Sequence, residues 1–213
     1  MAFNDYLKAL DAAIKAGGNF RAALIDQAPD RTNPPTREQL ISFLSKLRFA
    51  LQLETKAGAA VAKDAGQVGR RGAAIAEIET FVQNPSAPIV FTHIDRNLFA
   101  FQLALRVRSP RIINQDNTTL CGPVALVYDI AKRDPQRYVR FAISLFSSGT
   151  AMFGLTQVTP SETIRNGYRA NVLPEADYVV LASVRDTDRI VIETDMLRHI
   201  LTLTKPGALA EFL

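Results

Sequence analysis

The segment from Asn114 to Pro123 holds the residues of this chain that are best suited to covalent chemistry. It contains the only cysteine, Cys121, six residues after Gln115. Apolar residues follow the cysteine at a spacing of three and four, at Val124, Val127, Tyr128 and Ala131. This spacing predicts a helix that begins at or next to Cys121. Free backbone N–H groups and the positive end of the helix dipole favour a thiolate there, lowering a pKa that is about 8.5 in a free cysteine. Cys121 is therefore a candidate nucleophile.

Gln115 is the candidate for stabilising the charge that such a nucleophile creates. A thiolate that attacks a carbonyl produces an oxyanion, which needs a preorganised hydrogen-bond donor. A side-chain amide from the preceding segment, together with the backbone N–H of Cys121, could supply this donor. We therefore expect Gln115 to be the oxyanion donor.

This arrangement resembles the papain-like cysteine peptidase superfamily. The resemblance lies in Gln-x5-Cys, with Cys121 opening a helix and Gly122-Pro123 after it, and spans roughly residues 112–139. It is closest to the compact bacterial branch related to bacteriocin-processing peptidases, in which Cys-Gly-Pro-x-x-Leu is common. The resemblance implies a papain-like core, in which the cysteine helix packs on a small antiparallel sheet. It also implies a thiol protease or amidase acting on peptide, isopeptide or side-chain amide bonds of a protein or peptide substrate, as bacterial toxins and effectors do.

A catalytic cysteine needs a general base, which is nearly always histidine. The chain has two histidines, His93 and His199. His199 follows Cys121 by 78 residues, and the resemblance to compact bacterial relatives favours such a short spacing. His199 is therefore the candidate base. His93, beside Asp95, stays an alternative because catalytic triads recur in different chain orders.

The histidine of the relatives usually opens a strand of the type His-Tyr/Phe-Val-Val-Leu, and here Asp177 stands at that position, before Tyr178-Val179-Val180-Leu181. Three interpretations follow. His199 serves from a divergent position, the base lies beyond Leu213, or the protein is a catalytically inactive relative. The apolar pattern continues to Leu213, so we expect the core to extend further.

Composition describes an ordinary globular protein, with 213 residues of which 47% are hydrophobic. A single cysteine excludes an internal disulfide framework, and no apolar run reaches the roughly 18 residues that span a membrane. The N-terminal residues lack a secretory signal, which predicts a cytoplasmic protein, with signal-independent secretion into a target cell as the alternative.

Charge and motifs limit the remaining partners. The net charge is +4, with 25 basic residues scattered among 21 acidic ones. This scatter argues against nucleic-acid binding, our third hypothesis, which would need the arginines to converge on one face. We expect Arg106, Arg108 and Arg111 to form a solvated surface, with steering of an acidic substrate as the alternative. No metal-ligand cluster, phosphate loop or dinucleotide motif is present, so we expect no metal and no cofactor.

The N-terminal elements are predicted to be helical. Residues 3–28 suggest two short helices around a glycine break, and Thr36-Arg37-Glu38-Gln39 is a capping box that predicts a helix to about Thr55. Residues 56–72 are poor in large apolar side chains and are predicted to be a linker or weak helix. We therefore divide the chain into an N-terminal helical region with its linker, 1–72, and a papain-like cysteine hydrolase core, 73–213. In our second hypothesis the N-terminal helices bind another protein and the core is an inactive interaction module.

The C-terminal elements mix helices and strands. We predict helices over 73–82 and 98–107, a helix that begins at Asp134-Pro135 and ends near Gly149, and a short helix between Thr159 and Gly167. Strands are predicted at 89–91 and in a hairpin of 178–184 with 189–193. Helices first and strands later indicate an α+β fold.

Overall fold

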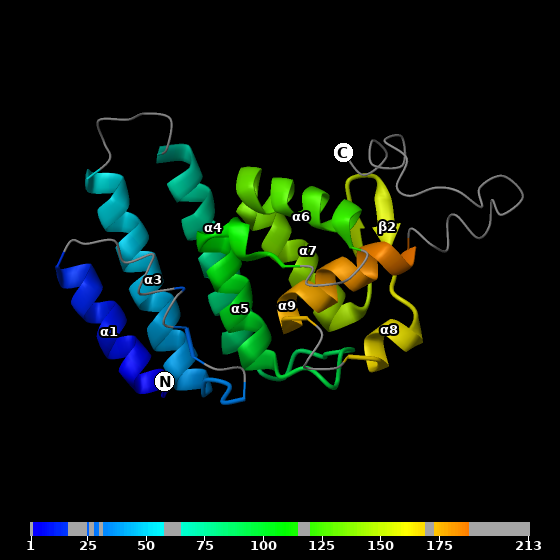
Figure 1. The fold of residues 1–213 in the computed structure, drawn as a ribbon, viewed down its shortest axis with the longest axis horizontal. Coiled ribbons are helices and arrows are strands. Elements are labelled where there is room, and N and C mark those ends of the chain that lie inside the picture. Colours follow the sequence, from blue (N-terminus) through cyan, green and yellow to red (C-terminus); the bar gives the residue numbers. More distant parts are fainter. Residues whose placement is uncertain are drawn as a thin grey trace, which may run out of the picture.

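The computed structural model describes residues 2–16, 25, 28–29, 32–57, 65–114, 120–168 and 173–187. Within these ranges the fold is α+β, mainly helical with one small antiparallel hairpin (Figure 1). The elements in chain order are α1 (Phe3–Lys15), α3 (Arg37–Ala57), α4 (Ala65–Gln83), α5 (Arg96–Arg108), the 3-10 turn η1 (Pro110–Ile112), α6 (Cys121–Arg133), α7 (Pro135–Ser148), β1 (Ala151–Phe153), β2 (Thr156–Val158), α8 (Glu162–Asn166), α9 (Glu175–Asp177) and the π-helical turn η2 (Tyr178–Ala182).

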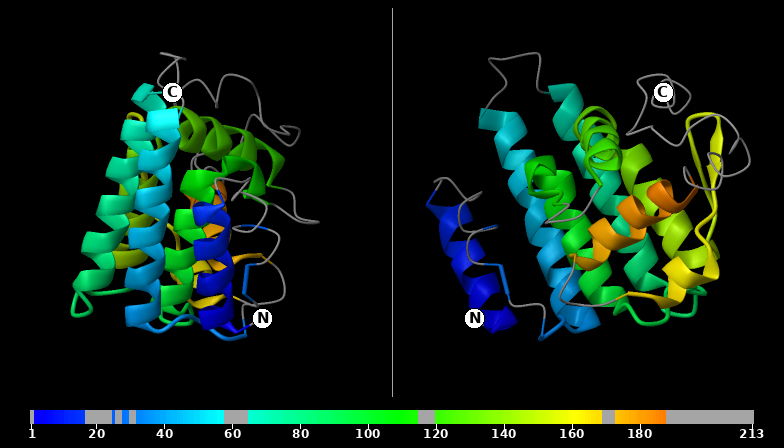
Figure 2. Two further views of the ribbon diagram at one scale, coloured as in Figure 1. Left: turned by 90° about the vertical axis from the view of Figure 1, so that its left-hand side faces the viewer. Right: turned by 45° about the vertical axis from the view of Figure 1, so that its right-hand side comes forward.

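Helix α4 lies in the middle of the helical layers. It packs against α3 on one side and against α5 and α7 on the other, while α1 covers α3 and α6 covers α7. Figure 2 shows α1, α3 and α4 side by side in both views. α9 and η2 form one continuous helical stretch that crosses α5 and α7.

The start of α3 confirms the predicted capping box. The backbone N–H of Thr36 donates to Oε1 of Gln39 at 2.9 Å, and the N–H of Gln39 donates to Oγ1 of Thr36 at 3.3 Å. Two backbone donors that the first helical turn leaves without partners are thus satisfied reciprocally. The helix ends at Ala57, two residues beyond the predicted end.

Helix α7 also begins and ends where the sequence predicts. The Asp134 side chain accepts from the backbone N–H of Arg137 at 3.1 Å, and Pro135 occupies the first helical position. Gly149 ends the helix with a left-handed φ of 73°, a conformation that glycine adopts without steric cost. Its N–H donates to the carbonyl oxygen of Leu145 at 2.9 Å.

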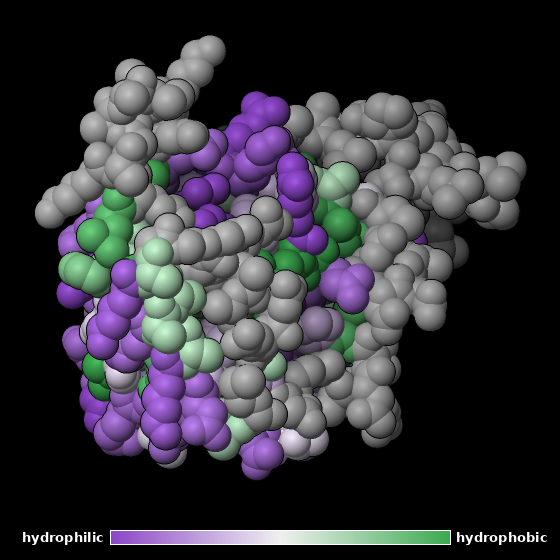
Figure 3. Space-filling model, turned by 60° about the vertical axis from the view of Figure 1, so that its left-hand side comes forward, coloured by the Kyte–Doolittle hydropathy of each residue, from purple (hydrophilic) through white to green (hydrophobic). Residues whose placement is uncertain are grey.

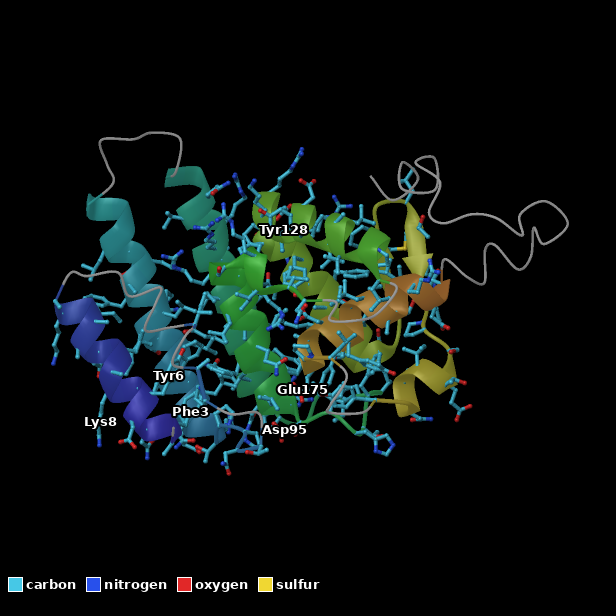
Figure 4. All side chains as sticks on the ribbon, viewed as in Figure 1. Phe3, Tyr6, Lys8, Asp95, Tyr128 and Glu175 are labelled. Atoms are coloured by element: carbon cyan, nitrogen blue, oxygen red, sulfur yellow. The ribbon has the colours of Figure 1, made fainter. Side chains whose placement is uncertain are left out.

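Aromatic side chains join the N-terminal helices to the rest of the core. Phe3 and Tyr6 of α1, Phe43 of α3 and Phe101 of α5 pack edge to face or tilted, with the Phe43 and Phe101 ring centroids 5.0 Å apart. Figure 4 labels Phe3 and Tyr6 on α1. Residues 65–72, predicted as linker or weak helix, belong to α4, so the division at residue 72 falls within a helix and stays a prediction.

Two predicted strands are wrong. Residues 178–184 are helical, and 89–91 form no strand; the hairpin lies instead at β1 and β2, where Ala151 pairs with Val158. The segment 178–184 is a short, continuously buried apolar run, and such a run does not distinguish a buried strand from a buried helix. Val90 donates its N–H to the carbonyl oxygen of Phe146 at 3.0 Å, a contact with the end of α7. The second predicted strand, 189–193, lies outside the described residues.

Candidate functional site

Cys121 is the first residue of α6, which confirms the predicted position of the cysteine at a helix start. Leu120 occupies the N-cap position and makes no side-chain capping hydrogen bond. Its carbonyl oxygen accepts from the N–H of Val124 at 2.9 Å, and Pro123 has no N–H to offer. No side-chain cap therefore competes with an anion for the first turn of α6 among the residues described.

The other two predicted site residues, Gln115 and His199, lie outside the described residues, as does the side chain of Cys121. The structure describes the chain up to Asn114, immediately before Gln115, and again from Leu120, immediately before Cys121. The contacts of these two flanking residues are therefore the nearest structural information on Gln115.

The alternative base, His93, is exposed in the turn before α5. Its neighbour Asp95 is the N-cap of that helix, and Oδ1 of Asp95 accepts from the N–H of Leu98 at 2.8 Å. Figure 4 places Asp95 at the lower end of the molecule and Tyr128 of α6 at the upper end. The carboxylate beside His93 thus caps a helix whose start is remote from α6.

Asp177, at the position where the resemblance expects histidine, forms a buried ion pair with Arg106. Nε of Arg106 donates to Oδ1 and Nη2 donates to Oδ2, both at 2.5 Å. Oδ2 of Asp177 also accepts from the backbone N–H of Asn114 at 3.0 Å. Asp177 therefore fixes the residue that precedes Gln115, a positioning role that sequence reasoning missed.

Further polar contacts surround this pair. Gln102 of α5 donates its side-chain amide to Glu175, and its Oε1 accepts from the backbone N–H of Ala176 at 3.1 Å. Oε1 of Glu175 accepts from the Tyr168 hydroxyl at 2.6 Å. α5 and α9 are thus joined by hydrogen-bonded polar side chains inside an otherwise apolar core, which satisfies the rule that buried polar groups need partners.

The pKa of Arg106 reflects opposing effects. Burial is the largest single effect and lowers the pKa of the guanidinium, but the charge and hydrogen bonds of Asp177, together with electrostatic interactions with Tyr138 and Glu175, raise it above its usual value. Arg106 is therefore a permanent cation in the core. A charge at this depth is retained only because a carboxylate neutralises it with matching geometry.

The predicted solvated cluster of Arg106, Arg108 and Arg111 is wrong for its first member, since Arg106 is buried. Positions 106 and 108 differ by about 200° around a helix, so the two side chains leave α5 on opposite sides. This helical periodicity is the signal in the sequence that predicts different environments for Arg106 and Arg108. Arg108 and Arg111 instead line a pocket together with Arg71 and Lys132.

The described residues contain no group of three His, Cys, Asp or Glu side chains that could hold a metal ion. Among the described helices, none has the length and apolar character needed to cross a membrane. No protein-family model, curated protein or solved structure matches the chain. A function for the protein therefore has to be inferred from its own residues.

Proposed function

We propose that the protein is a papain-like cysteine hydrolase with Cys121 as its nucleophile, acting on peptide, isopeptide or side-chain amide bonds. The observation that supports this most is the position of Cys121 as the first residue of α6, without a side-chain cap among the described residues. Backbone N–H groups and the helix dipole at such a position stabilise a thiolate relative to the thiol. The thiolate is the reactive form in acyl transfer.

The second part of the proposal concerns Gln115 as the oxyanion donor. The residue before it, Asn114, is held by the hydrogen bond from its N–H to Asp177. In this proposal the Gln115 amide and the Cys121 N–H donate to the oxyanion that forms after attack. A histidine, His199, takes the thiol proton and returns it to the leaving amine. Asp177 does not replace that histidine, because its carboxylate is engaged by Arg106.

Alkylation kinetics test the nucleophile without knowledge of the substrate. The folded protein is treated with iodoacetamide between pH 5 and 9, and the labelled fraction of Cys121 is followed by mass spectrometry. We expect labelling of the native protein with a midpoint below about 8.5, the value of a free cysteine. A thiol that labels only after denaturation would contradict the proposal.

Turnover of a quenched fluorescent peptide library tests the assigned roles. Cys121→Ala should abolish turnover. Gln115→Ala should lower kcat by roughly 10- to 1,000-fold, because its amide meets the charge only after attack. His199→Ala should lower kcat by about 10²- to 10⁴-fold. Unchanged turnover in His199→Ala would reject His199 as the base, whereas unchanged turnover in Cys121→Ala would reject the hydrolase itself.

A second function, a non-catalytic protein-binding module, is favoured by one observation on α3. Phe49 and Leu53 lie one helical turn apart and are 54% and 37% exposed. Exposed large apolar side chains at this spacing suit a helical partner protein. Binding of a partner that survives Cys121→Ala but is lost in Phe49→Asp would support this module over the hydrolase.

A further inference from the structure

A pocket of about 230 Å³ lies where the end of α5, the turn η1, α4 and α6 meet. Its lining consists of the residues Arg71, Arg108, Ser109, Pro110, Arg111, Tyr128 and Lys132. Figure 4 shows Tyr128 on α6 at the upper end of the molecule, well separated from Glu175 of the buried network. Hydrophilic side chains gather at this upper end on the face shown in Figure 3. The pocket and the network are therefore separate features.

Among the described residues, the lining has four cationic side chains and no acidic one. They come from α4, α5, η1 and α6, whose positions in the sequence span more than sixty residues, so the fold and not a local basic tract brings them together. Without these four, the remaining basic residues of the chain equal its 21 acidic residues in number. The summed charge of the four cationic side chains in the lining thus equals the net charge of the whole protein, +4.

Several cations elsewhere in the protein form ion pairs with carboxylates. Arg48 lies 2.7 Å from Glu79, and Lys46 lies 2.6 Å from Asp11. On α6 itself, Arg133 pairs with Asp129 at 2.7 Å, so the carboxylate nearest in sequence to Lys132 is already engaged. These carboxylates do not belong to the described lining of the pocket.

An anion bound among these four cationic side chains gains a favourable electrostatic interaction with each of them. Arginine presents a planar fork of N–H donors that matches phosphate oxygens in a bidentate manner, and lysine adds a point charge. Lys132 also lies over the Tyr128 ring, 5.7 Å from its centroid, which holds the ammonium at the pocket. The donor set is therefore suited to a ligand with several negative charges.

We propose that this pocket binds a phosphate or diphosphate group, either free or as the anionic end of a small molecule. The volume is below the roughly 300–1,000 Å³ of sites that enclose drug-sized ligands, so the pocket accommodates an anionic group and leaves the rest of a larger ligand outside. Four cations match the charge of a diphosphate better than that of a single carboxylate. Single-stranded nucleic acid is less suited, because it requires a groove along which several aromatic rings stack bases, and Tyr128 is the one aromatic ring among the described residues of this lining.

The proposal does not depend on the chemistry of Cys121. Tyr128 follows Cys121 by seven residues on α6, a rise of about 10 Å along the helix axis. An inactive Cys121→Ala protein should therefore bind the anion as well as the wild type does. A protein that does not bind the anion would not argue against the proposed hydrolase activity, and an unreactive Cys121 thiol would not argue against the proposed anion site.

Isothermal titration calorimetry with sodium pyrophosphate and with inorganic phosphate tests the pocket. We expect pyrophosphate to bind more tightly than phosphate, and both to bind more weakly as NaCl is raised, because salt screens partly exposed charges. The double variant Arg71→Gln/Lys132→Gln should lose pyrophosphate affinity by about tenfold or more, since hydrogen bonds to charged groups carry the binding. Arg137→Gln, which removes the same charge from an exposed position on α7 outside the lining, is the matched control and should bind normally.

Thermal unfolding of each variant verifies that it is folded, and Lys132→Gln alone, at an exposed position, keeps the test interpretable if the double variant fails to fold. Equal loss of affinity in Arg137→Gln would overturn the proposal, because binding would then follow net charge. Absence of pyrophosphate binding by the wild-type protein would also overturn it. So would tight binding of a single-stranded RNA oligonucleotide without binding of pyrophosphate, which would assign the pocket to a nucleic-acid surface.

Discussion

Arg106 and Asp177 form a two-pronged ion pair across the interior, with both hydrogen bonds at 2.5 Å and side chains that are 4% and 0% exposed. The pair joins α5 to the last residue of α9. Because the same carboxylate accepts from the Asn114 N–H, it also connects both helices to the residue that precedes Gln115. One side chain thus takes part in the buried ion pair and in holding the chain near the candidate site.

Arg106→Met should lower the free energy of unfolding by about 3–5 kcal/mol. The methionine fills much of the space of the arginine stem, but Asp177 is then left buried without a compensating charge, which is the costly outcome for a buried pair. Urea denaturation followed by circular dichroism measures the change.

The double variant Arg106→Met/Asp177→Leu is the control for this mechanism. It removes both charges together, so its loss should be smaller than the sum of the two single losses, and smaller than the loss in Arg106→Met alone. Additive losses would show that the two side chains act independently and that the pair is not what holds α9 to α5.

Tyr138→Phe should leave stability unchanged or raise it by up to about 1–2 kcal/mol. The Tyr138 hydroxyl is buried and has no hydrogen-bond partner among the described residues, so it carries a desolvation cost without a bond to offset it. Burial and the nearby Asp177 charge raise the pKa of Tyr138 despite the opposing charge of Arg106, so the phenol stays neutral.

Tyr168→Phe is the contrasting control. The Tyr168 hydroxyl donates to Glu175 at 2.6 Å, so its removal should destabilise the protein. Destabilisation by Tyr138→Phe would mean that its hydroxyl has a partner.

The local signals of this sequence predict the helix ends well. The capping box at Thr36, the Asp134-Pro135 start and the Gly149 stop are each confirmed, because each depends on residues within a few positions of one another. The start of α6 at Cys121 was predictable for the same reason, from apolar spacing alone. Of the candidate site, the sequence thus predicts the position of Cys121 at a helix start, which depends only on residues close to it in the chain.

The errors concern contacts between distant segments. Residues 178–184 look like a strand because their mostly apolar run is consistent with either structure. They continue a helical stretch that begins at Glu175, and the side chains of Glu175 and Asp177 bind α5 at positions 71 to 73 residues away. The sequence predicts Arg106 at the surface because nothing nearby in the chain shows its carboxylate. The basic pocket escaped for the same reason, since Arg71 and Lys132 are brought together only by packing of α4 and α6 around the end of α5.

Glu77 should make a small, pH-dependent contribution to stability. Its Oε1 accepts a hydrogen bond from the Arg140 guanidinium, and it accepts a second one from the Gln136 amide at 3.0 Å. These hydrogen bonds and the Arg140 charge hold the pKa of the carboxyl below its usual range, although partial burial opposes them. A lowered pKa in the folded state means that the stabilisation is fully present above the unfolded value of about 4.3 and is lost as the pH falls through the folded value.

Urea denaturation of wild type and Glu77→Gln between pH 2.5 and 7 measures this contribution. The difference in unfolding free energy should be no more than about 1 kcal/mol at pH 7, because the pair is partly exposed, and should vanish at the acid end. Glu162→Gln, an exposed substitution of the same type on α8, should show no such trend. A difference that grows as the pH falls would have the wrong sign for a lowered pKa.

Asp177→Asn should loosen the attachment of the loop before Cys121. Asp177 accepts three hydrogen bonds on two oxygens, two from Arg106 and one from the Asn114 N–H. Asparagine has one acceptor oxygen and turns a donor amide toward the remaining N–H groups, so at least one of the three bonds is lost. If the amide faces Asn114, that N–H should exchange with solvent at least about tenfold faster, since a hydrogen bond to a charged group is worth about 1.5–3 kcal/mol and 1.4 kcal/mol is tenfold.

Hydrogen exchange measured by NMR at the Asn114 amide tests this, with Asp129→Asn as a control that changes a carboxylate on α6 outside the network. Faster exchange together with a changed rate of Cys121 alkylation would tie the buried pair to the candidate site, whereas an Asn114 amide that exchanges as in the wild type would show that the loop is anchored by other contacts.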